Sequence, residues 1–498
     1  MKQVSLLIPT FSRPQWLHPK VARTEILAGL VVAIALIPEA ISFSILAGVD
    51  PRVGLFASFT MAVTIAFTGG RPAMISAATG AIALVVAPLA REYGLEYLIA
   101  AVILGGIFQV LLAFAGVARL MRFVPRSVMV GFVNALAILI FTSQLQYLID
   151  VPWVVYPMVV IGIAIIFIMP KITTVIPGPL VTVVLLTLTV VLLNVNVPRV
   201  GDQGELPNSL PVLGIPSVPF TFDTFMIIAP FAVAIALVGL MESLMTAKLV
   251  DDITDTRSNK TRESWGQGVA NIVTGFFGGM GGCAMIGQTM INVRSGARTR
   301  LSTFLAGVFL LILVVSLGEV VATIPMAALV AVMVVVAYAT FDWHSLRTIL
   351  AMPKSETTVM LATVIATLIT HNLAIGVGAG VVTATVLFAR RVAHLVSMNR
   401  ILEIDVESGE EIVRYQVHGE MFFASSNDLV YQFEYTEDPD TVIIDLTAAH
   451  VWDASTVATL DAVVSKYERR HKSVVIVGFN EKSAEFHDRL SGRLNSEH

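Results

Sequence analysis

Residues 275–299 read GFFGGMGGCAMIGQTMINVRSGART, in which five glycines come before a short uncharged run. This run cannot cross a bilayer, because a membrane-spanning helix needs about 20 mostly apolar residues. A matching piece lies in the first half, where GGRP at 69–72 precedes the equally short run MISAATGAIALVVAPL at 74–89. Paired, interrupted segments of this kind are the best sequence pointer to the binding site of a secondary transporter.

The physical reason is electrostatic. A helix that begins in mid-membrane points unpaired backbone N–H groups and a positive dipole end into the protein, which favours a bound anion. Irregular backbone at that depth must line a cavity or be buried in protein. The alternative is that both glycine clusters are ordinary surface turns.

Composition is typical of a multi-span membrane protein. Of the 498 residues, 56% are hydrophobic and 14% charged, with a mean hydropathy of +0.80, whereas soluble domains are about 45–50% apolar and about 25% charged. The net charge of −4 argues against a nucleic-acid partner, and the single cysteine excludes an intramolecular disulfide and a cysteine-based metal site. Residues 1–20 hold three prolines and no sustained apolar core, so we expect no cleavable signal peptide.

Apolar stretches predict about fourteen helical segments. They begin near Thr24, Val53, Met74, Tyr97, Val128, Val154, Val175, Phe225, Gly266, Ala284, Ser302, Ile324, Thr357 and Leu373. The polar stretch 196–223, with five prolines, separates the seventh segment from the eighth and is interpreted as a hinge between two halves. Seven is an odd number, so the second half must enter the membrane upside down, as in inverted repeats. We therefore predict a polytopic α-helical membrane domain at 24–395, with repeats at about 24–195 and 224–391, after a cytoplasmic segment at 1–23.

The two halves repeat the same unusual features in the same order. Each begins with a helix that carries an acid, Glu39 or Glu242, and continues with the glycine-led short helix. A helix led by a proline, Pro125 or Pro325, follows. This order supports the two repeats.

Basic residues indicate which side of the membrane is the cytoplasm. With the N-terminus inside, fourteen arginines and lysines fall on the inner side and three, Arg52, Arg91 and Arg199, on the outer side. The inner set is Arg71, Arg119, Arg122, Arg126, Lys171, Lys248, Arg257, Lys260, Arg262, Arg294, Arg298, Arg300, Arg347 and Lys354. Cytoplasmic loops carry the excess of basic residues, so we expect a multi-pass protein of a bacterial-type plasma membrane with both termini in the cytoplasm.

From about Arg400 the pattern changes to that of a small soluble α/β domain, at 400–498. Period-two and β-rich stretches at 412–417, 441–446 and 473–477 alternate with helical stretches at 425–433, 455–469 and 482–491. Since the last membrane segment ends inside, this domain is expected to be cytoplasmic. Ser455 is suited to cap a helix N-terminus.

Three motifs carry a family resemblance: QGVAN at 267–271, GFFGG at 275–279 and NVRSGART at 292–299. In these motifs the chain resembles the sulfate permease (SulP) family of anion transporters, relatives of prestin. The resemblance extends to Pro38, Gly131-Phe132 and Pro325, and the C-terminal part, with DAST at 453–456, is similar to a STAS domain. It implies fourteen segments in two inverted repeats, a core and a gate domain, an anion between the facing ends of the third and tenth helices, and a homodimer. Phosphorylation of Ser455 is a possibility at the family level only.

The resemblance places the anion site at the ends of the two half-helices. The candidate substrate-binding residues are Ala77, Ala78, Thr79, Gly80, Ile286, Gly287, Gln288 and Thr289. Small residues let backbone N–H groups approach an oxyanion, and Thr79, Gln288 and Thr289 can donate side-chain hydrogen bonds. Animal members of the family have an arginine where Gln288 stands. Without that charge the site must rely on dipoles or on a bound cation, which favours a co-transported proton or sodium. Alternatively, Gln288 only pairs with a neighbouring helix.

Glu39 is the first candidate for ion coupling. It lies about fifteen residues into the first span, after Pro38, and an ionised carboxylate near mid-membrane costs at least ~2.5–3.5 kcal/mol. A buried acid here would favour its neutral form and could take up a proton together with an anion. The alternative is a structural hydrogen bond to the core.

Glu242 is the second candidate, with Thr246 one turn further on the same helix face. Together they offer oxygen ligands, and sodium-coupled bicarbonate members of the family have an acid at the matching place. A sodium site at Glu242 and Thr246 is therefore one interpretation. The alternative is a structural salt bridge or helix cap within the core. His371 and the lone Cys283 lack partner spacing for a metal or nucleophile, so packing is their expected role. Arg294, Arg298 and Arg300 are expected to set topology or to attract anions.

We therefore expect a secondary active transporter of small anions (sulfate, bicarbonate or dicarboxylates), a proton-coupled symporter of elevator type. Its partners are a small inorganic or carboxylate anion and the lipid bilayer; it is not an enzyme and needs no cofactor beyond the co-transported proton or sodium. The absence of a phosphate-binding loop motif argues against ATP-driven pumping. The alternatives are a sodium-coupled bicarbonate symporter, or an anion channel or sensor without coupling.

Overall fold

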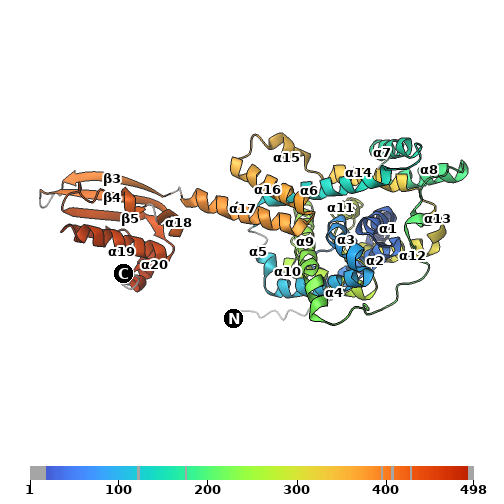
Figure 1. The fold of residues 1–498 in the computed structure, drawn as a ribbon, viewed down its shortest axis with the longest axis horizontal. Coiled ribbons are helices and arrows are strands. Elements are labelled where there is room, and N and C mark those ends of the chain that lie inside the picture. The colour runs from blue at the N-terminus through green and yellow to red at the C-terminus, as the bar shows by residue number, and fades with distance from the viewer. Residues whose placement is uncertain are drawn as a thin grey trace, which may run out of the picture. The chain divides into compact units, whose positions relative to one another are not determined.

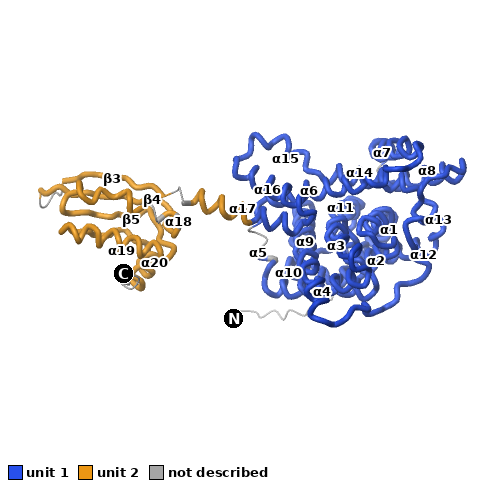
Figure 2. Tube along the Cα trace, viewed as in Figure 1, with its two compact units in different colours: residues 1–381 blue, residues 382–498 orange. Residues whose placement is uncertain are grey.

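The computed structural model describes residues 18–120, 124–173, 176–393, 396–404, 409–426 and 429–491. Residues 1–17 of the predicted N-terminal segment, and Arg122 of the inner basic set, lie outside these ranges. The chain forms two compact units, residues 1–381 and 382–498, which Figure 2 shows in two colours. Each unit has its own hydrophobic core.

Among the described residues, the membrane unit has seven main helices before residues 196–221 and seven after (Figure 1). The first seven are α1 (Pro19–Ala47), α2 (Pro51–Thr68), α3 (Gly80–Tyr93), α4 (Leu95–Phe114), α6 (Arg126–Gln144), α7 (Val155–Ile172) and α8 (Gly178–Leu192). The second seven are α9 (Phe222–Thr254), α10 (Lys260–Phe276), α11 (Ile286–Arg294), α12 (Arg300–Ser316), α14 (Met326–Thr340), α16 (Lys354–Thr370) and α17 (Leu373–Ala393). Short turns of helix lie between them: α5 (Val117–Leu120), α13 (Gly318–Ala322), α15 (Trp343–Thr348), η3 (Leu145–Leu148) and η4 (Val200–Gln203). The predicted fourteen segments are therefore confirmed.

Seven of the described helices are long and apolar enough to cross a membrane. The helices α3 and α11, with 14 and 9 residues, are among those that are not. Figure 1 shows both of them in the interior of the membrane unit. They are the two half-helices that the glycine-led segments predict.

Helix packing follows the two repeats. Where α1 packs on α12, its counterpart α9 packs on α4, and where α2 packs on α12, α10 packs on α4. Eight helices, α1–α4 and α9–α12, form one group, which we call the core. The remaining six, α6–α8, α14, α16 and α17, form a second group, which we call the gate.

Short strands precede the two half-helices, where the sequence predicts apolar segments that begin near Met74 and Ala284. Strand β1 (Ser76–Ala77) pairs antiparallel with β2 (Cys283–Ala284). The two backbone segments come so close that a Cβ atom on Gly282 would lie 2.0 Å from the carbonyl oxygen of Ala77. Glycine is therefore required at this crossing.

The connection at 196–221 is bonded along its length, and is not the free hinge that its prolines suggest. Val200 N–H donates to the Ile324 carbonyl and Met326 N–H to the Pro198 carbonyl, both at 2.9 Å, next to α14 of the gate. On the core side, Arg52 N–H donates to the Glu205 carbonyl at 3.1 Å. The connection therefore attaches to both groups of helices.

The second unit is a four-stranded sheet with helices, and this agrees with the predicted α/β domain. The strand order is β3-β4-β5-β6, with β3 antiparallel to β4 and the other neighbours parallel. Its elements are β3 (Ser397–Ile404), β4 (Glu411–Met421), α18 (Phe423–Ser426), η5 (Leu429–Gln432), β5 (Thr441–Val451), α19 (Ala454–Glu468), β6 (Ser473–Val477) and α20 (Glu481–Leu490). Strand β3 is an addition to the prediction, and the N-cap of α19 is Asp453, not Ser455.

Candidate functional site

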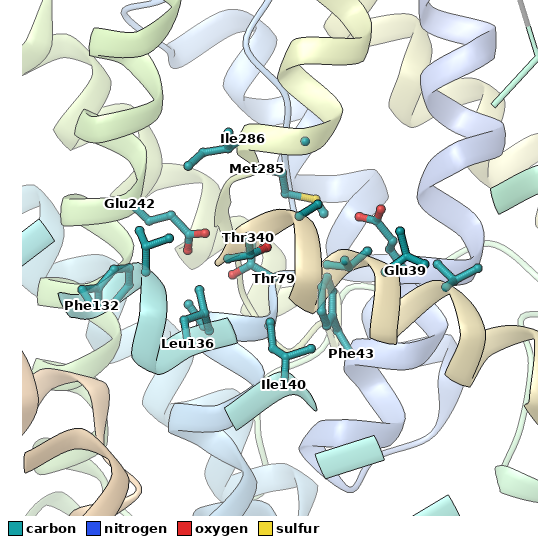
Figure 3. Close-up of a pocket in the computed structure, with 18 of the residues that line it drawn as sticks. Glu39, Phe43, Thr79, Phe132, Leu136, Ile140, Glu242, Met285, Ile286 and Thr340 are labelled. Atoms are coloured by element: carbon teal, nitrogen blue, oxygen red, sulfur yellow. The ribbon is translucent and has the colours of Figure 1, made fainter. Parts of the chain in front are cut away.

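A cavity of about 340 Å³ lies between the core and the gate, beside the two half-helices (Figure 3). This volume falls in the range of about 300–1,000 Å³ that small-molecule sites occupy. Core residues that line it are Glu39, Phe43, Thr79, Gly80, Ala81, Glu242, Met245, Met285, Ile286 and Gly287. Gate residues that line it are Phe132, Val133, Leu136, Ile140, Pro179, Val332, Val335, Val336, Ala339 and Thr340.

The N-terminus of α11 is open toward this cavity. No side chain caps it, and none of the described residues accepts a hydrogen bond from the N–H groups of Ile286, Gly287 or Gln288. A Cβ atom built on Gly287 would meet no atom within 4 Å. The unpaired N–H groups and the positive dipole end together form a place where an anion is favoured.

The N-terminus of α3 is more closed. Thr79 is its N-cap, and the Thr79 hydroxyl accepts from the Ile82 N–H at 3.4 Å. A Cβ atom on Gly80 would lie 2.9 Å from the Phe43 ring and 3.0 Å from Ile140. The two half-helix ends are therefore unequal, and α11 offers the freer one.

Two carboxyl groups face the cavity from equivalent helices. Glu39 and Glu242 are each the twenty-first residue of their helix, counted from the first residues of α1 and α9. Figure 3 shows them on opposite sides of the cavity, with Thr79 between them. Among the described residues that line the cavity there is no lysine, arginine or histidine. An anion here would lie near two acids and no cationic side chain.

Gln288 interacts with Glu39. The Gln288 side chain is 1% exposed, and its amide forms a hydrogen bond with the Glu39 carboxyl group. The Gln288 Oε1 atom is buried and has no hydrogen-bond partner among the described residues. Gln288 does not line the cavity. It therefore contacts Glu39 from the side that faces away from the cavity.

Cys283 joins Glu242 to Thr79, which corrects the prediction that it only packs. The Cys283 Sγ lies 2.7 Å from Oε2 of Glu242 and 3.0 Å from the hydroxyl oxygen of Thr79. The cysteine itself is fully buried. Its position between the glycine cluster and the half-helix is a signal that sequence reasoning did not use.

The Thr246 hydroxyl lies away from the cavity. It donates to the main-chain carbonyl of Glu242 at 2.8 Å, and the side chain is buried. Hard cations take several oxygen ligands, and among the described residues no three histidine, cysteine or acidic side chains converge. We assign no metal ligand here.

The other predicted residues support the site from behind. The Ala78 N–H donates to the Ser58 hydroxyl at 3.3 Å, and the Thr289 hydroxyl accepts from the Ile75 N–H at 3.0 Å. Ala77 belongs to β1. Ala77, Ala78 and Thr289 are fully buried and do not line the cavity. A large side chain at Ala78 would therefore disrupt packing before it could block a ligand.

The basic residues of the α11–α12 loop also lie outside the cavity. A guanidinium nitrogen of Arg298 donates to the carbonyls of Val293 and Ala297, and Arg300 donates to those of Ala66 and Gly69. These bonds connect chain segments within the core, in addition to any role in topology.

The apolar gate wall is the part of the site that sequence reasoning missed. Nine of its ten lining residues are apolar, and Thr340 is the exception. The GF pair at 131–132 serves the sequence analysis as a mark of resemblance, and the proline-led α14 as a feature shared by the two repeats; neither is predicted to line the site. Their place beside the half-helices depends on how the repeats pack. The spacing of apolar residues along the sequence cannot predict this packing.

Comparisons with known proteins agree with this architecture. Residues 23–156 and 150–363 match the model of the sulfate permease family, and residues 403–491 match that of the STAS domain. YbaR of Bacillus subtilis (strain 168), provisionally named as a sulfate transporter, is 51% identical over 461 residues, which are 93% of this chain and 95% of YbaR. The bicarbonate transporter BicA of Picosynechococcus is 25% identical over 512 residues, covering 93% of this chain and 89% of BicA.

Two solved structures share the fold. The transmembrane domain of a cyanobacterial BicA superposes with a TM-score of 0.64 at 24% identity, over 74% of this chain and 98% of that one. The murine anion transporter Slc26a9 in its inward-facing state gives a TM-score of 0.80 at 16% identity, over 95% of this chain and 89% of that one.

Proposed function

This chain belongs to the sulfate permease family, and we propose that it is a secondary active transporter that carries a small anion together with a proton. It is a multi-pass membrane protein with a STAS domain, and its family transports anions such as sulfate and bicarbonate. The identity of the anion and the coupling are the proposed part.

One observation carries the proposal. The uncapped N-terminus of α11 opens into a cavity that two carboxyl groups line and no cationic side chain lines, among the described residues. The backbone can bind an anion there, but no cationic side chain among the described lining residues offsets its full charge. Protons bound to the carboxyl groups can offset the charge of the anion. A passive channel would not need such protonation.

The division of the cavity wall supports an elevator-like movement. The core supplies the half-helix ends and both acids, whereas the gate wall is almost entirely apolar. If the core moves against the gate, the whole set of polar groups moves with the anion. Among the gate residues that line the cavity, Thr340 is the one polar group that could retain the anion on the way.

Glu39 is the proposed proton carrier. The Gln288 amide lies against its carboxyl group, with Oε1 still free to accept a hydrogen bond. An amide has both donors and an acceptor, so it can stabilise a carboxylate through its N–H groups and a carboxylic acid through its oxygen. Gln288 is therefore suited to a group that changes its protonation state.

The placement in the membrane is part of the same proposal. We expect a bacterial-type plasma membrane, both termini and the STAS domain in the cytoplasm, and a homodimer. The bias of fourteen basic residues against three supports the orientation, and the resemblance to the family supports the dimer.

The test is uptake into proteoliposomes of radiolabelled sulfate, bicarbonate and succinate, with a proton gradient, a sodium gradient or neither. We expect one anion to accumulate above its external concentration only with the proton gradient. Accumulation that needs sodium would support the sodium symporter instead, and equilibration without accumulation would support a channel. If no anion is taken up or bound, the proposed function is wrong.

A further inference from the structure

Three side chains of the core form a line that ends in the cavity. Glu242 on α9, Cys283 on β2 and Thr79 before α3 follow one another at 2.7 Å and 3.0 Å. Glu242 and Thr79 both line the cavity, whereas Cys283 lies buried between them. A thiol between a carboxyl and a hydroxyl is able to donate to one and accept from the other.

We propose that Cys283 transmits the protonation state of Glu242 to Thr79, so that the Thr79 hydroxyl donates to a bound anion only when Glu242 carries a proton. The proposal rests on the proposed function and adds a positioning residue to it. It also gives the second acid a role that differs from that of Glu39.

With Glu242 ionised, the carboxylate can only accept. The Cys283 S–H then donates to Oε2 of Glu242, and the Thr79 O–H donates to Sγ of Cys283. The single hydroxyl hydrogen of Thr79 is then donated to the thiol. Thr79 therefore cannot donate a hydrogen bond to an anion in the cavity.

With a proton on Oε2 of Glu242, the direction of the line reverses. The carboxyl O–H donates to Sγ, the S–H donates to the Thr79 oxygen, and the Thr79 O–H becomes free to point into the cavity. The oxygen of Thr79 can accept the thiol hydrogen and the Ile82 N–H together, because a hydroxyl has two lone pairs. One proton is added at Glu242, and no bond to a heavy atom changes elsewhere.

Few other titratable groups face this line. Glu39 lies on the opposite side of the cavity, on α1. Among the elements that pack on α9, Arg91 stands in the last turn of α3 and Arg294 at the last residue of α11. Glu263 of α10 accepts from the Gly70 and Arg71 N–H groups, and Glu96 of α4 from the Ser217 N–H. These charges belong to other helix ends, as do Glu92 of α3 and Lys260 and Arg262 of α10. Glu39 is therefore the group that must be controlled.

The first test uses the S–H stretching band in the infrared, since the chain has one cysteine. The sample is the full-length Glu39→Gln protein in detergent, titrated with pH in the absence of any anion and then with sulfate or bicarbonate. We expect the band to shift as Glu242 is protonated, because the acceptor of the thiol changes from a carboxylate to a hydroxyl. A band that stays constant across the titration, while the carboxylic C=O band of Glu242 appears, overturns the relay.

The second test measures sulfate and bicarbonate affinity against pH in the same Glu39→Gln background. Cys283→Ala removes the relay and should leave only the smaller change of affinity with pH that the charge of Glu242 itself causes, whereas Cys283→Ser keeps a donor and an acceptor and should retain the full change. We expect about a ten-fold gain in affinity on protonation when the relay is intact, the size of one hydrogen bond to a charged group. Thr182→Val on α8, a buried hydroxyl outside the line, is the matched control and should behave like its parent.

The outcomes separate the two proposals. If neither anion binds at any pH, the proposed function fails, while the anion-free infrared titration still decides whether Cys283 responds to Glu242. If an anion binds and Cys283→Ala keeps the full pH dependence, the relay is wrong and the proposed function stands. If Cys283→Ala does not fold, two measurements still test the relay. They are the S–H band of the protein with Cys283 intact and the pH dependence of Cys283→Ser.

Discussion

Asn271 holds Gly282 by both of its main-chain groups: the Asn271 Oδ1 accepts from the Gly282 N–H at 2.9 Å, and the Nδ2 donates to the Gly282 carbonyl at 3.1 Å. The same Nδ2 also donates to Oε1 of Gln109 at 2.9 Å. Gly282 comes directly before β2 and lies against the Ala77 carbonyl. The last residue of the QGVAN motif therefore fixes the crossing from which α11 starts.

Asn271→Asp should destabilise the membrane unit. The substitution removes both Nδ2 hydrogen bonds and leaves buried acceptors unpaired, at about 1–3 kcal/mol for each unsatisfied group. The measurement is the melting temperature in detergent, and we expect a clear decrease. Asn208→Asp, at an exposed position, is the control and should melt like the parent. Equal melting of the two variants would mean that Asn271 does not hold the crossing.

Gly287→Trp should abolish anion binding and leave the fold intact. The position above Gly287 is empty, so a large side chain fits there but covers the free N–H groups of α11. We expect at least a ten-fold loss of sulfate or bicarbonate affinity at an unchanged melting temperature. Gly378→Trp on α17 is the matched control, because it also has nothing within 4 Å and lies away from the cavity. Unchanged binding by Gly287→Trp would move the anion site elsewhere.

Glu39→Gln should separate exchange from coupling. Glutamine resembles the neutral carboxyl group and cannot carry a proton, so binding or exchange of the anion should remain while uphill uptake is lost. By linkage, a proton that tightens anion binding is itself bound more tightly when the anion is present. Proteoliposome uptake with and without a pH gradient is the measurement. If the variant accumulates anion as well as the parent does, with the same pH dependence, Glu39 is structural.

Removal of the STAS domain should leave a folded membrane unit. Both repeats are complete at Ala393, where α17 ends, and the first strand of the second unit begins at Ser397. A chain that ends before Ser397 should keep a cooperative melting transition in detergent, with altered transport or trafficking. Aggregation of this shortened protein in a detergent that supports the parent would show that the units do not fold separately.

The stability of the second unit should decrease in acid through Asp445. Hydrogen bonds from the side chain and N–H of Thr447, together with the charge of Arg414, lower the pKa of Asp445 below its ordinary value. The carboxylate therefore stabilises the fold above the ordinary pKa near ~3.9, and this stability is lost as pH falls through the lower folded value. Urea unfolding of residues 396–491 between pH 6 and pH 3 should show a smaller decrease for Asp445→Asn than for the parent. The exposed Asp440→Asn is the control and should follow the parent.

The sequence predicts the number and approximate starts of the membrane helices because each is an apolar run between charges or prolines. It also points to the half-helices, since residues 74–89 and 284–293 are too short to span a bilayer. The strands β1 and β2 escape such reasoning, because two residues have no periodicity. The contacts of Cys283 escape it as well, since they join residues 41 and 204 positions apart. Packing of one repeat on the other brings Thr79 to Cys283, and the folding of the second repeat brings Glu242 to it.

If the core moves against the gate as proposed, the connection at 196–221 limits how far it can travel. Its anchor on the gate is Val200 and its anchor on the core is Glu205, bonded to Ile324 and Arg52. Five residues in full extension reach at most ~17 Å. The connection therefore bounds the separation of these two anchors in the proposed movement: a larger separation requires the Glu205 or the Val200 hydrogen bond to break. Lengthening this loop would extend the permitted separation without touching the cavity.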